Sequence, residues 1–163
     1  RYIEEHPDTK LVLVPHEIHD KHLHEIFQIF HGRYVRFTEA TPLNITHCQT
    51  LLIDTIGMLS SIYQYGQVAY IGGGFGVGIH NTIEAAVYGI PVLFGPNYRH
   101  FREALGLIQA GAGFSVKNYS EFEVQMDNAL SAHEALGRKA REYVESELGA
   151  TEKIYSELFT ENL

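Results

Sequence analysis

Short apolar runs alternate with helix-like segments along most of the chain. Residues 18–31 illustrate the helical pattern, because Leu23, Ile26, Phe27 and Phe30 fall on one face of a helix. Further helices are expected at 58–65, 81–88, 101–110, 120–131, 134–148 and 151–159. The apolar runs expected to form strands are Leu11–Pro15, Tyr34–Phe37, Leu51–Thr55, Val68–Ile71, Pro91–Phe94 and Gly113–Val116. This alternation predicts an α/β fold, a Rossmann-like doubly wound parallel sheet of about six strands within one domain, 1–163.

The net charge and the lengths of the apolar stretches exclude two classes of function. The chain has 163 residues, 45% of them hydrophobic, and a formal net charge of −8. No basic run could neutralise a phosphate backbone, so nucleic acid is not an expected partner. No apolar stretch approaches the length of about 20 residues that a membrane helix needs, so we expect a soluble domain. The chain opens with Arg1 and not with Met, which suggests a piece of a longer protein.

The strongest local signal is a glycine-rich segment between an expected strand and an expected helix. Residues 72–78 contain five glycines in seven positions. In parallel α/β sheets ligands bind beyond the carboxyl ends of the strands, and bare backbone beside a helix N-terminus suits a phosphate. The segment fits neither the dinucleotide fingerprint nor a Walker loop. The alternative interpretation is that the glycines serve close packing only.

Polar residues after the other strands are further candidates. Asn81 and Glu84 have capping-box spacing, but a carboxylate at Glu84 also suits the two donor hydroxyls of a ribose. Asp54 and Thr55 precede an expected helix, where capping is slightly favoured over ligand binding. Asn97 suits either a ligand contact or a turn.

Several histidines lie close together in the sequence, but their spacing does not match that of a metal-binding motif. His16, His19, His22 and His24 lie close together in sequence, yet no HExxH motif occurs. We therefore expect no metal site. His16 differs from the others because it directly follows the first clear strand and can face the ligand crevice.

One block of residues resembles a known family. The pattern H-N-x-x-E-A-A-x-x-G-x-P-V runs from His80 to Val92, is preceded by the glycine-rich segment and is followed by Gly95-Pro96. It closely resembles the C-terminal half of the 3-deoxy-D-manno-octulosonic acid (Kdo) transferases of Gram-negative bacteria. The resemblance extends to residues 15–18 and 54–59, and to nearly all of the chain.

The resemblance implies a GT-B glycosyltransferase, in which two Rossmann-like domains face each other across a cleft. The C-terminal domain, to which residues 1–163 would correspond, binds the donor CMP-Kdo. The N-terminal domain, which is not in this chain, receives the lipid A precursor. Such enzymes invert the anomeric centre without a cofactor or a metal, at the cytoplasmic face of the bacterial inner membrane, during lipopolysaccharide biosynthesis.

The resemblance also assigns expected roles to residues. The glycine loop, with His80 and Asn81, would hold the CMP phosphate, and Glu84 would take the ribose hydroxyls. Where many family members carry an arginine after Pro15, this chain has His16, the candidate for that positive charge. The general base belongs to the N-terminal domain, so the fragment alone is expected to be inactive and to hold no catalytic residue. The full set expected to bind the donor is His16, Asp54, Thr55, Gly57, Gly73, Gly74, Phe75, Gly76, Gly78, His80, Asn81, Glu84 and Asn97.

Two rival functions share parts of this pattern. A UDP-sugar-dependent GT-B transferase or epimerase would also place a glycine loop and a ribose-binding glutamate here, and would prefer uridine to cytidine nucleotides. A non-catalytic flavodoxin-like module would share the alternation and would bind FMN, or accept a phosphoryl group at Asp54.

Overall fold

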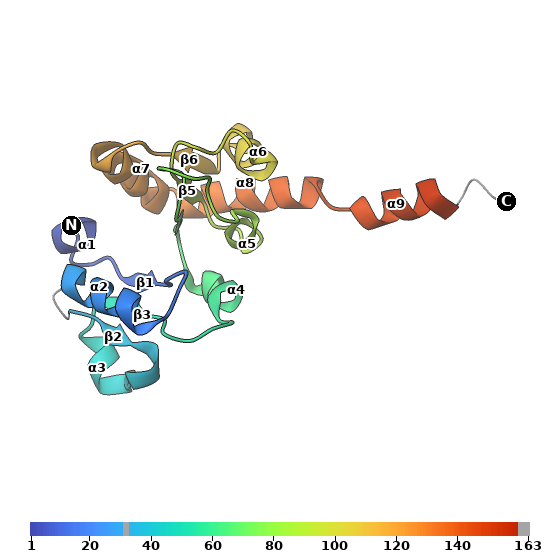
Figure 1. Ribbon diagram of the computed structural model, residues 1–163. Helices are drawn as coiled ribbons and strands as arrows, with labels where there is room; N and C mark the ends of the chain where they lie inside the picture. The colour runs from blue at the N-terminus through green and yellow to red at the C-terminus, as the bar shows by residue number, and fades with distance from the viewer. Residues whose placement is uncertain (31–32, 160–163) are drawn as a thin grey trace. The chain divides into compact units, whose positions relative to one another are not determined.

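The computed structural model describes residues 1–30 and 33–159. The chain divides into two compact units, Arg1–Ile62 and Tyr63–Leu163. Among the described residues, each unit contains one three-stranded parallel sheet with helices connecting the strands (Figure 1).

The first unit is built on a sheet with the strand order β1-β3-β2. In the central strand, Leu52 pairs with Leu13 of β1 and Arg36 of β2. Leu23 and Ile26 of α2 pack with Leu52 to form the small core of this unit, as the apolar helix face predicts. The elements are α1 (Tyr2–Glu5), β1 (Leu11–Leu13), α2 (Asp20–Phe30), β2 (Val35–Arg36), η1 (Phe37–Glu39), α3 (Pro42–Thr46), β3 (Thr50–Leu52) and α4 (Leu59–Ile62).

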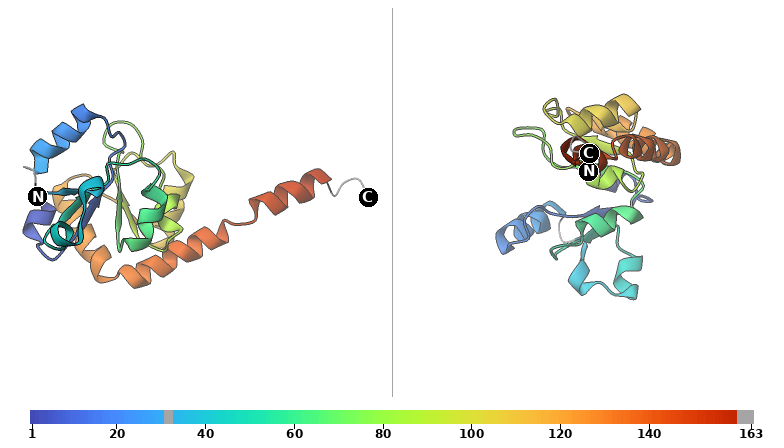
Figure 2. Two further views of the ribbon diagram at one scale, coloured as in Figure 1. Left: turned by 90° about the horizontal axis from the view of Figure 1, so that it is seen from below. Right: turned by 90° about the vertical axis from the view of Figure 1, so that its right-hand side faces the viewer.

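The second unit carries the larger core, on a sheet with the strand order β4-β5-β6. Its C-terminal helices, α8 and then α9, follow one another along the chain (Figure 2). The elements are η2 (Tyr63–Tyr65), β4 (Ala69–Ile71), α5 (Ile83–Ala86), β5 (Val92–Phe94), α6 (Arg102–Ala110), β6 (Gly113–Ser115), α7 (Tyr119–Ser131), α8 (His133–Ser146) and α9 (Ala150–Phe159).

Helices cover both faces of the second sheet because its central strand is apolar on both sides. Val92 and Phe94 pack with residues of α5, α6 and α8, including Leu107. Leu93 points to the opposite face and packs with Ala129 of α7. All three β5 side chains are fully buried, and burial of each stabilises the fold by about 1.5–3 kcal/mol. A wholly buried parallel strand explains the uninterrupted apolar run in the sequence.

The comparison with the expected fold gives one confirmation and one correction. The α/β class with parallel strands is confirmed, but the described strands form two sheets of three and not one sheet of six. The reason is that the strands pair only within their own compact unit: β3 is hydrogen-bonded to β1 and β2 of the first unit, and β5 to β4 and β6 of the second.

Helix boundaries also differ from the expected ones. The helix expected at 58–65 is a single turn, α4, followed by the 3₁₀ helix η2. The helix expected at 81–88 is reduced to Ile83–Ala86. The helix expected at 18–31 is observed as Asp20–Phe30, with residue 31 outside the described range. None of the described helices is long and apolar enough to cross a membrane.

Candidate functional site

The glycine-rich segment forms a closed loop between β4 and α5. Gly73 and Ile79 form an antiparallel bridge. The Gly74 N–H donates to the Gly78 carbonyl at 3.2 Å, and the His80 N–H donates to the Gly72 carbonyl at the same distance. The loop is therefore a narrow hairpin fixed at its base by backbone hydrogen bonds.

Several of its glycines are required by close packing. Gly74 has a φ of +81°, and a Cβ there would lie 2.9 Å from the Gly95 Cα. A Cβ on Gly78 would lie 2.3 Å from the ring of Phe101. Gly76, by contrast, has no atom within 4 Å of an added Cβ. The packing interpretation is thus correct for the base of the loop, whereas packing does not explain the glycine at its tip.

The tip of this loop presents unused backbone donors. The N–H groups of residues 75–78 donate no hydrogen bond to any described residue. The side chains of Phe75 and Val77 are 57% and 90% exposed. Consecutive N–H groups at an exposed turn are a common way to hold a phosphate oxygen.

Asn97 braces the loop from the end of the neighbouring strand. Its backbone N–H donates to the Gly74 carbonyl at 2.9 Å, and its side-chain Nδ2 donates to the Gly76 carbonyl at 3.1 Å. The two bonds connect the residue that follows β5 and Pro96 to both sides of Phe75. The structure therefore brings Asn97 and the glycine loop together, as the positions at adjacent strand ends predict.

Asn81 and Glu84 form a direct side-chain contact. The Asn81 Nδ2 donates to Glu84 Oε1 at 3.0 Å, and the Asn81 Oδ1 accepts from the Ile83 N–H at 3.0 Å. The expected capping box is wrong in its partners, because α5 begins at Ile83 and its N-cap is Thr82, one residue after Asn81. Asn81 therefore lies outside the helix and holds the Glu84 carboxylate from the preceding turn.

Tyr63 is a neighbour of Glu84 that the sequence did not reveal. Burial raises the pKa of the Tyr63 phenol, and the nearby Glu84 carboxylate raises it further. Tyr63 packs against the main core, and its ring centroid lies 6.4 Å from that of Tyr88. Tyr63 and Glu84 are 21 positions apart, and no sequence pattern links them.

Asp54 makes a different contact from the one expected. Its Oδ2 accepts from the Thr38 hydroxyl at 2.6 Å and its Oδ1 accepts from the Thr38 N–H at 3.1 Å. Burial raises the pKa of Asp54, but these hydrogen bonds, its own N–H and the charge of Arg36 together bring the pKa below its usual value. The expectation that Asp54 caps the next helix is wrong, because α4 begins only at Leu59.

The remaining expected residues of the first unit are near the surface. The Thr55 hydroxyl donates to the Met58 sulfur at 2.8 Å. Gly57 has a φ of +86° and no atom within 4 Å of an added Cβ. His16 is exposed, as is His80 of the second unit. His16, Asp54, Thr55 and Gly57 belong to the first unit, and the glycine loop, Asn81, Glu84 and Asn97 to the second.

The histidine-rich segment pairs its rings with nearby carboxylates. His19 Nε2 lies 2.8 Å from Glu17 Oε2, and His22 Nδ1 lies 3.4 Å from Glu25 Oε2. Within residues 1–30 and 33–159, no group of three or more His, Cys, Asp or Glu side chains is arranged to hold a metal ion.

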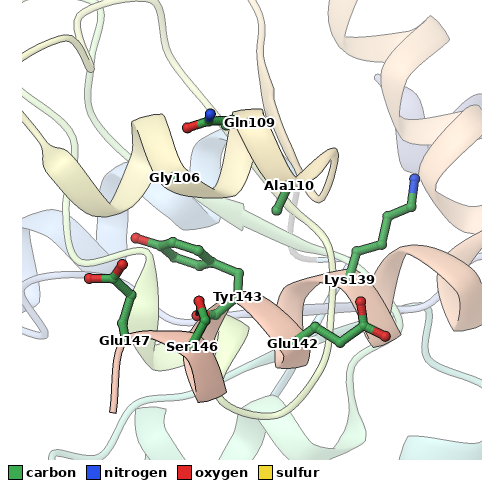
Figure 3. Close-up of a pocket in the computed structure, with 8 residues that line it drawn as sticks. All are labelled: Gly106, Gln109, Ala110, Lys139, Glu142, Tyr143, Ser146 and Glu147. Atoms are coloured by element: carbon green, nitrogen blue, oxygen red, sulfur yellow. Dashed lines mark hydrogen bonds between the residues drawn. The ribbon is translucent and has the colours of Figure 1, made fainter. Parts of the chain in front are cut away.

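A surface hollow of about 420 Å³ lies between α6 and α8 (Figure 3). Tyr143 points toward α6, where a Cβ on Gly106 would lie 2.3 Å from the ring. Glu147 forms an ion pair with Arg102 at 2.7 Å. None of the expected donor-binding residues lines this hollow. The lining residues are Gly106, Gln109, Ala110, Lys139, Glu142, Tyr143, Ser146 and Glu147.

The relatives of this chain among known proteins share one enzyme name. No family model matches the chain. The chain is 35% identical over 125 residues to a 3-deoxy-D-manno-octulosonic acid transferase of Aquifex aeolicus, covering 75% of this chain and 34% of the relative. It is 31% identical over 145 residues to a probable mitochondrial 3-deoxy-D-manno-octulosonic acid transferase of Arabidopsis thaliana, covering 82% and 31%. A Rickettsia prowazekii relative of the same name aligns over 98% of this chain and 34% of its own length, at 25% identity.

A solved structure has the same fold. The C-terminal CMP-Kdo binding domain of WaaA from Acinetobacter baumannii superimposes with a TM-score of 0.70. The match covers 88% of this chain and 77% of that domain, at 22% sequence identity. This likeness confirms the expected fold, which the chain shares with that C-terminal domain. The chain spans about a third of the length of the curated relatives that it matches. The resemblance stated from the glycine loop and the residues after it is confirmed: the chain is a homologue of part of the 3-deoxy-D-manno-octulosonic acid transferases.

Proposed function

We propose that this chain binds the donor CMP-Kdo, and that the whole protein transfers Kdo from it to a lipid A precursor with inversion at the anomeric carbon. The observation that carries the proposal is the braced glycine loop. Its N–H groups at 75–78 donate to no described residue. Asn97 donates hydrogen bonds to the carbonyls of Gly74 and Gly76, on either side of Phe75. The related Kdo transferases and the shared fold of a CMP-Kdo binding domain support this choice of ligand.

The loop is suited to the phosphate of CMP. Backbone donors that are already oriented stabilise negative charge without reorganising when the bond between the sugar and the phosphate breaks. The hairpin base and Asn97 fix these donors before the ligand arrives, which reduces the entropy cost of binding. His80, next to the base of the loop, would add a polar group at the same phosphate.

Glu84 is suited to the ribose. A carboxylate only accepts hydrogen bonds, and the two ribose hydroxyls can both donate. Its Oε1 is held by Asn81, and its Oε2 accepts no hydrogen bond from any residue that the structure describes. One oxygen is thus fixed by the protein and the other is left for the ligand.

The remaining roles belong to the proposal and rest on the resemblance. His16, Asp54, Thr55 and Gly57 would contribute to the donor site, with His16 in place of the arginine that many family members carry. The general base and the lipid acceptor site would lie in an N-terminal domain outside this chain, so we expect no transfer by the fragment alone. Donor binding would require no metal, and the whole protein would work at the cytoplasmic face of the inner membrane.

Calorimetric titration of the chain with CMP, UMP and FMN, with EDTA present, tests the proposal. We expect saturable CMP binding and clearly weaker UMP and FMN binding. Because hydrogen bonds to a charged group contribute about 1.5–3 kcal/mol each, Glu84→Ala should weaken CMP binding at least about tenfold.

The matched control is Glu121→Ala, which removes a carboxylate from the first turn of α7. It should leave CMP affinity unchanged. Preferential binding of UMP or FMN, or no CMP binding at all, would contradict the proposal.

A further inference from the structure

We propose that Asn81 is a positioning residue that orients the Glu84 carboxylate toward the ribose 2′-hydroxyl, so that the pair selects ribonucleotides over 2′-deoxyribonucleotides. The inference rests on the proposed function and deepens it, because it assigns the discrimination between sugars to two named side chains.

Both polar atoms of the Asn81 side chain are already engaged. Oδ1 accepts from the Ile83 N–H and Nδ2 donates to Glu84 Oε1, each at 3.0 Å. The flipped amide would place two donors together and two acceptors together, so only one orientation satisfies both contacts. The backbone of α5 therefore fixes the amide, and the amide fixes one oxygen of Glu84.

A second Asn-x-x-Glu pair in the same chain shows what a purely structural pair does. Asn118 is the N-cap of α7, and its Oδ1 accepts from the Glu121 N–H at 2.9 Å. Glu121 uses both oxygens within the protein: Oε1 accepts from Asn118 Nδ2 at 3.4 Å and Oε2 from the Lys117 N–H at 3.0 Å. That pair is a complete cap for a helix of 13 residues.

The Asn81–Glu84 pair is only a partial cap, because its one bond to the helix backbone is from the Ile83 N–H to the Asn81 Oδ1. Asn81 is not the N-cap of α5, which has only four residues, and Glu84 returns no hydrogen bond to a backbone N–H. In the described part of the chain its Oε2 has no hydrogen-bonded partner. A carboxylate held on one oxygen with the other left available is arranged for an external donor.

Fixing the carboxylate matters because Glu84 is partly exposed and its side chain is long. Ordering such a side chain on binding costs about 0.5–1.5 kcal/mol, which a preformed contact removes in advance. The Glu84 charge also acts on the Tyr63 phenol, whose pKa it raises together with burial. Recognition of a hydroxyl by an oriented acceptor discriminates strongly against an analogue that lacks it.

The test compares CMP with 2′-deoxy-CMP by calorimetry on the 163-residue chain. We expect the unmodified chain to bind CMP at least about tenfold more tightly, and Asn81→Ala to reduce this ratio at least about fivefold, mainly by weakening CMP. Asn81→Asp keeps an acceptor for the Ile83 N–H but removes the donor to Glu84, so it should reduce the ratio as well. Asn118→Ala, the matched control, should leave the ratio unchanged.

The outcomes separate this inference from the proposed function. If Asn81→Ala weakens CMP and 2′-deoxy-CMP by the same factor, the positioning role is wrong while the proposed function stands. If Asn81→Asp keeps the full ratio of CMP to 2′-deoxy-CMP affinity, the hydrogen bond from Asn81 Nδ2 to Glu84 is not needed for the discrimination. The inference then also fails. If the unmodified chain binds no CMP, the proposed function fails and the inference with it. Circular dichroism and thermal melting identify any variant that has lost its fold, and Asn81→Asp then carries the test.

Discussion

Gly74 is the position where the structure makes the sharpest prediction about the loop. It combines a φ of +81° with a close approach of backbone to backbone, because an added Cβ would lie 2.7 Å from the Ile79 Cγ2 and 2.9 Å from the Gly95 C and Cα. Gly74→Ala therefore strains the local conformation and separates the loop from Gly95. Backbone atoms cannot move aside as a flexible side chain can.

The expected loss of folding free energy in Gly74→Ala is the sum of two contributions. A left-handed conformation costs a residue with a Cβ about 1–2 kcal/mol, and forcing an extra methyl into a packed contact costs about 1–3 kcal/mol. Their sum is roughly 2–5 kcal/mol, which is a large part of the 5–15 kcal/mol that typically stabilises a domain. At about 2–4 °C per kcal/mol for a chain of this size, Tm should fall by about 4–20 °C.

Thermal and urea unfolding followed by circular dichroism measure this effect. Gly76→Ala is the matched control in the same loop, because nothing lies within 4 Å of its Cβ and its φ is not left-handed. Its stability should stay within about 0.5 kcal/mol of the unmodified chain. Equal effects of the two substitutions, or a Gly74→Ala variant as stable as the unmodified chain, would refute the described loop geometry.

Three further predictions follow from single contacts. Asn97→Ala removes the side-chain bond to the Gly76 carbonyl and should increase amide hydrogen exchange at 74–78, while unchanged exchange would show that the brace is not needed. Leu107→Ala empties a fully buried site and should lower the free energy of unfolding by about 2–5 kcal/mol, measured by urea denaturation; a loss under 1 kcal/mol would contradict the packing. Because its pKa is lowered in the fold, Asp54 stabilises the fold fully above its ordinary value of 3.8, and this contribution is lost as the pH falls through the folded pKa. Thr38→Val should move the Asp54 pKa back upward in a carboxyl NMR titration, and no change would contradict the Thr38 contact.

Local patterns predicted most of the secondary structure. The apolar run at Val92–Phe94 marks a strand buried on both faces, and Gly111, with a φ of +73°, ends α6 where the sequence predicts. These features depend on neighbouring residues, so the sequence contains them directly. Strand pairing depends on residues far apart, and for that reason alternation alone could not show that β3 is paired on both edges.

The site was predictable as a set of positions but not as a set of contacts. The glycine loop and Asn97 lie together because adjacent parallel strands end at the same edge of a sheet. The partner of Asp54 is Thr38, 16 residues earlier, and Tyr63 approaches Glu84 from η2. Neither the Asp54–Thr38 contact nor the proximity of Tyr63 to Glu84 follows from spacing, since both depend on how segments fold back within their unit.

The central claim is that the glycine loop and Glu84 hold a cytidine nucleotide. Amide NMR spectra of the chain during a CMP titration test it most directly. The account predicts that the largest shifts fall on residues 75–78 and on Glu84, with smaller shifts at the Asn97 side chain that braces the loop. Shifts confined to other surfaces, such as the hollow between α6 and α8 around Tyr143, would contradict it.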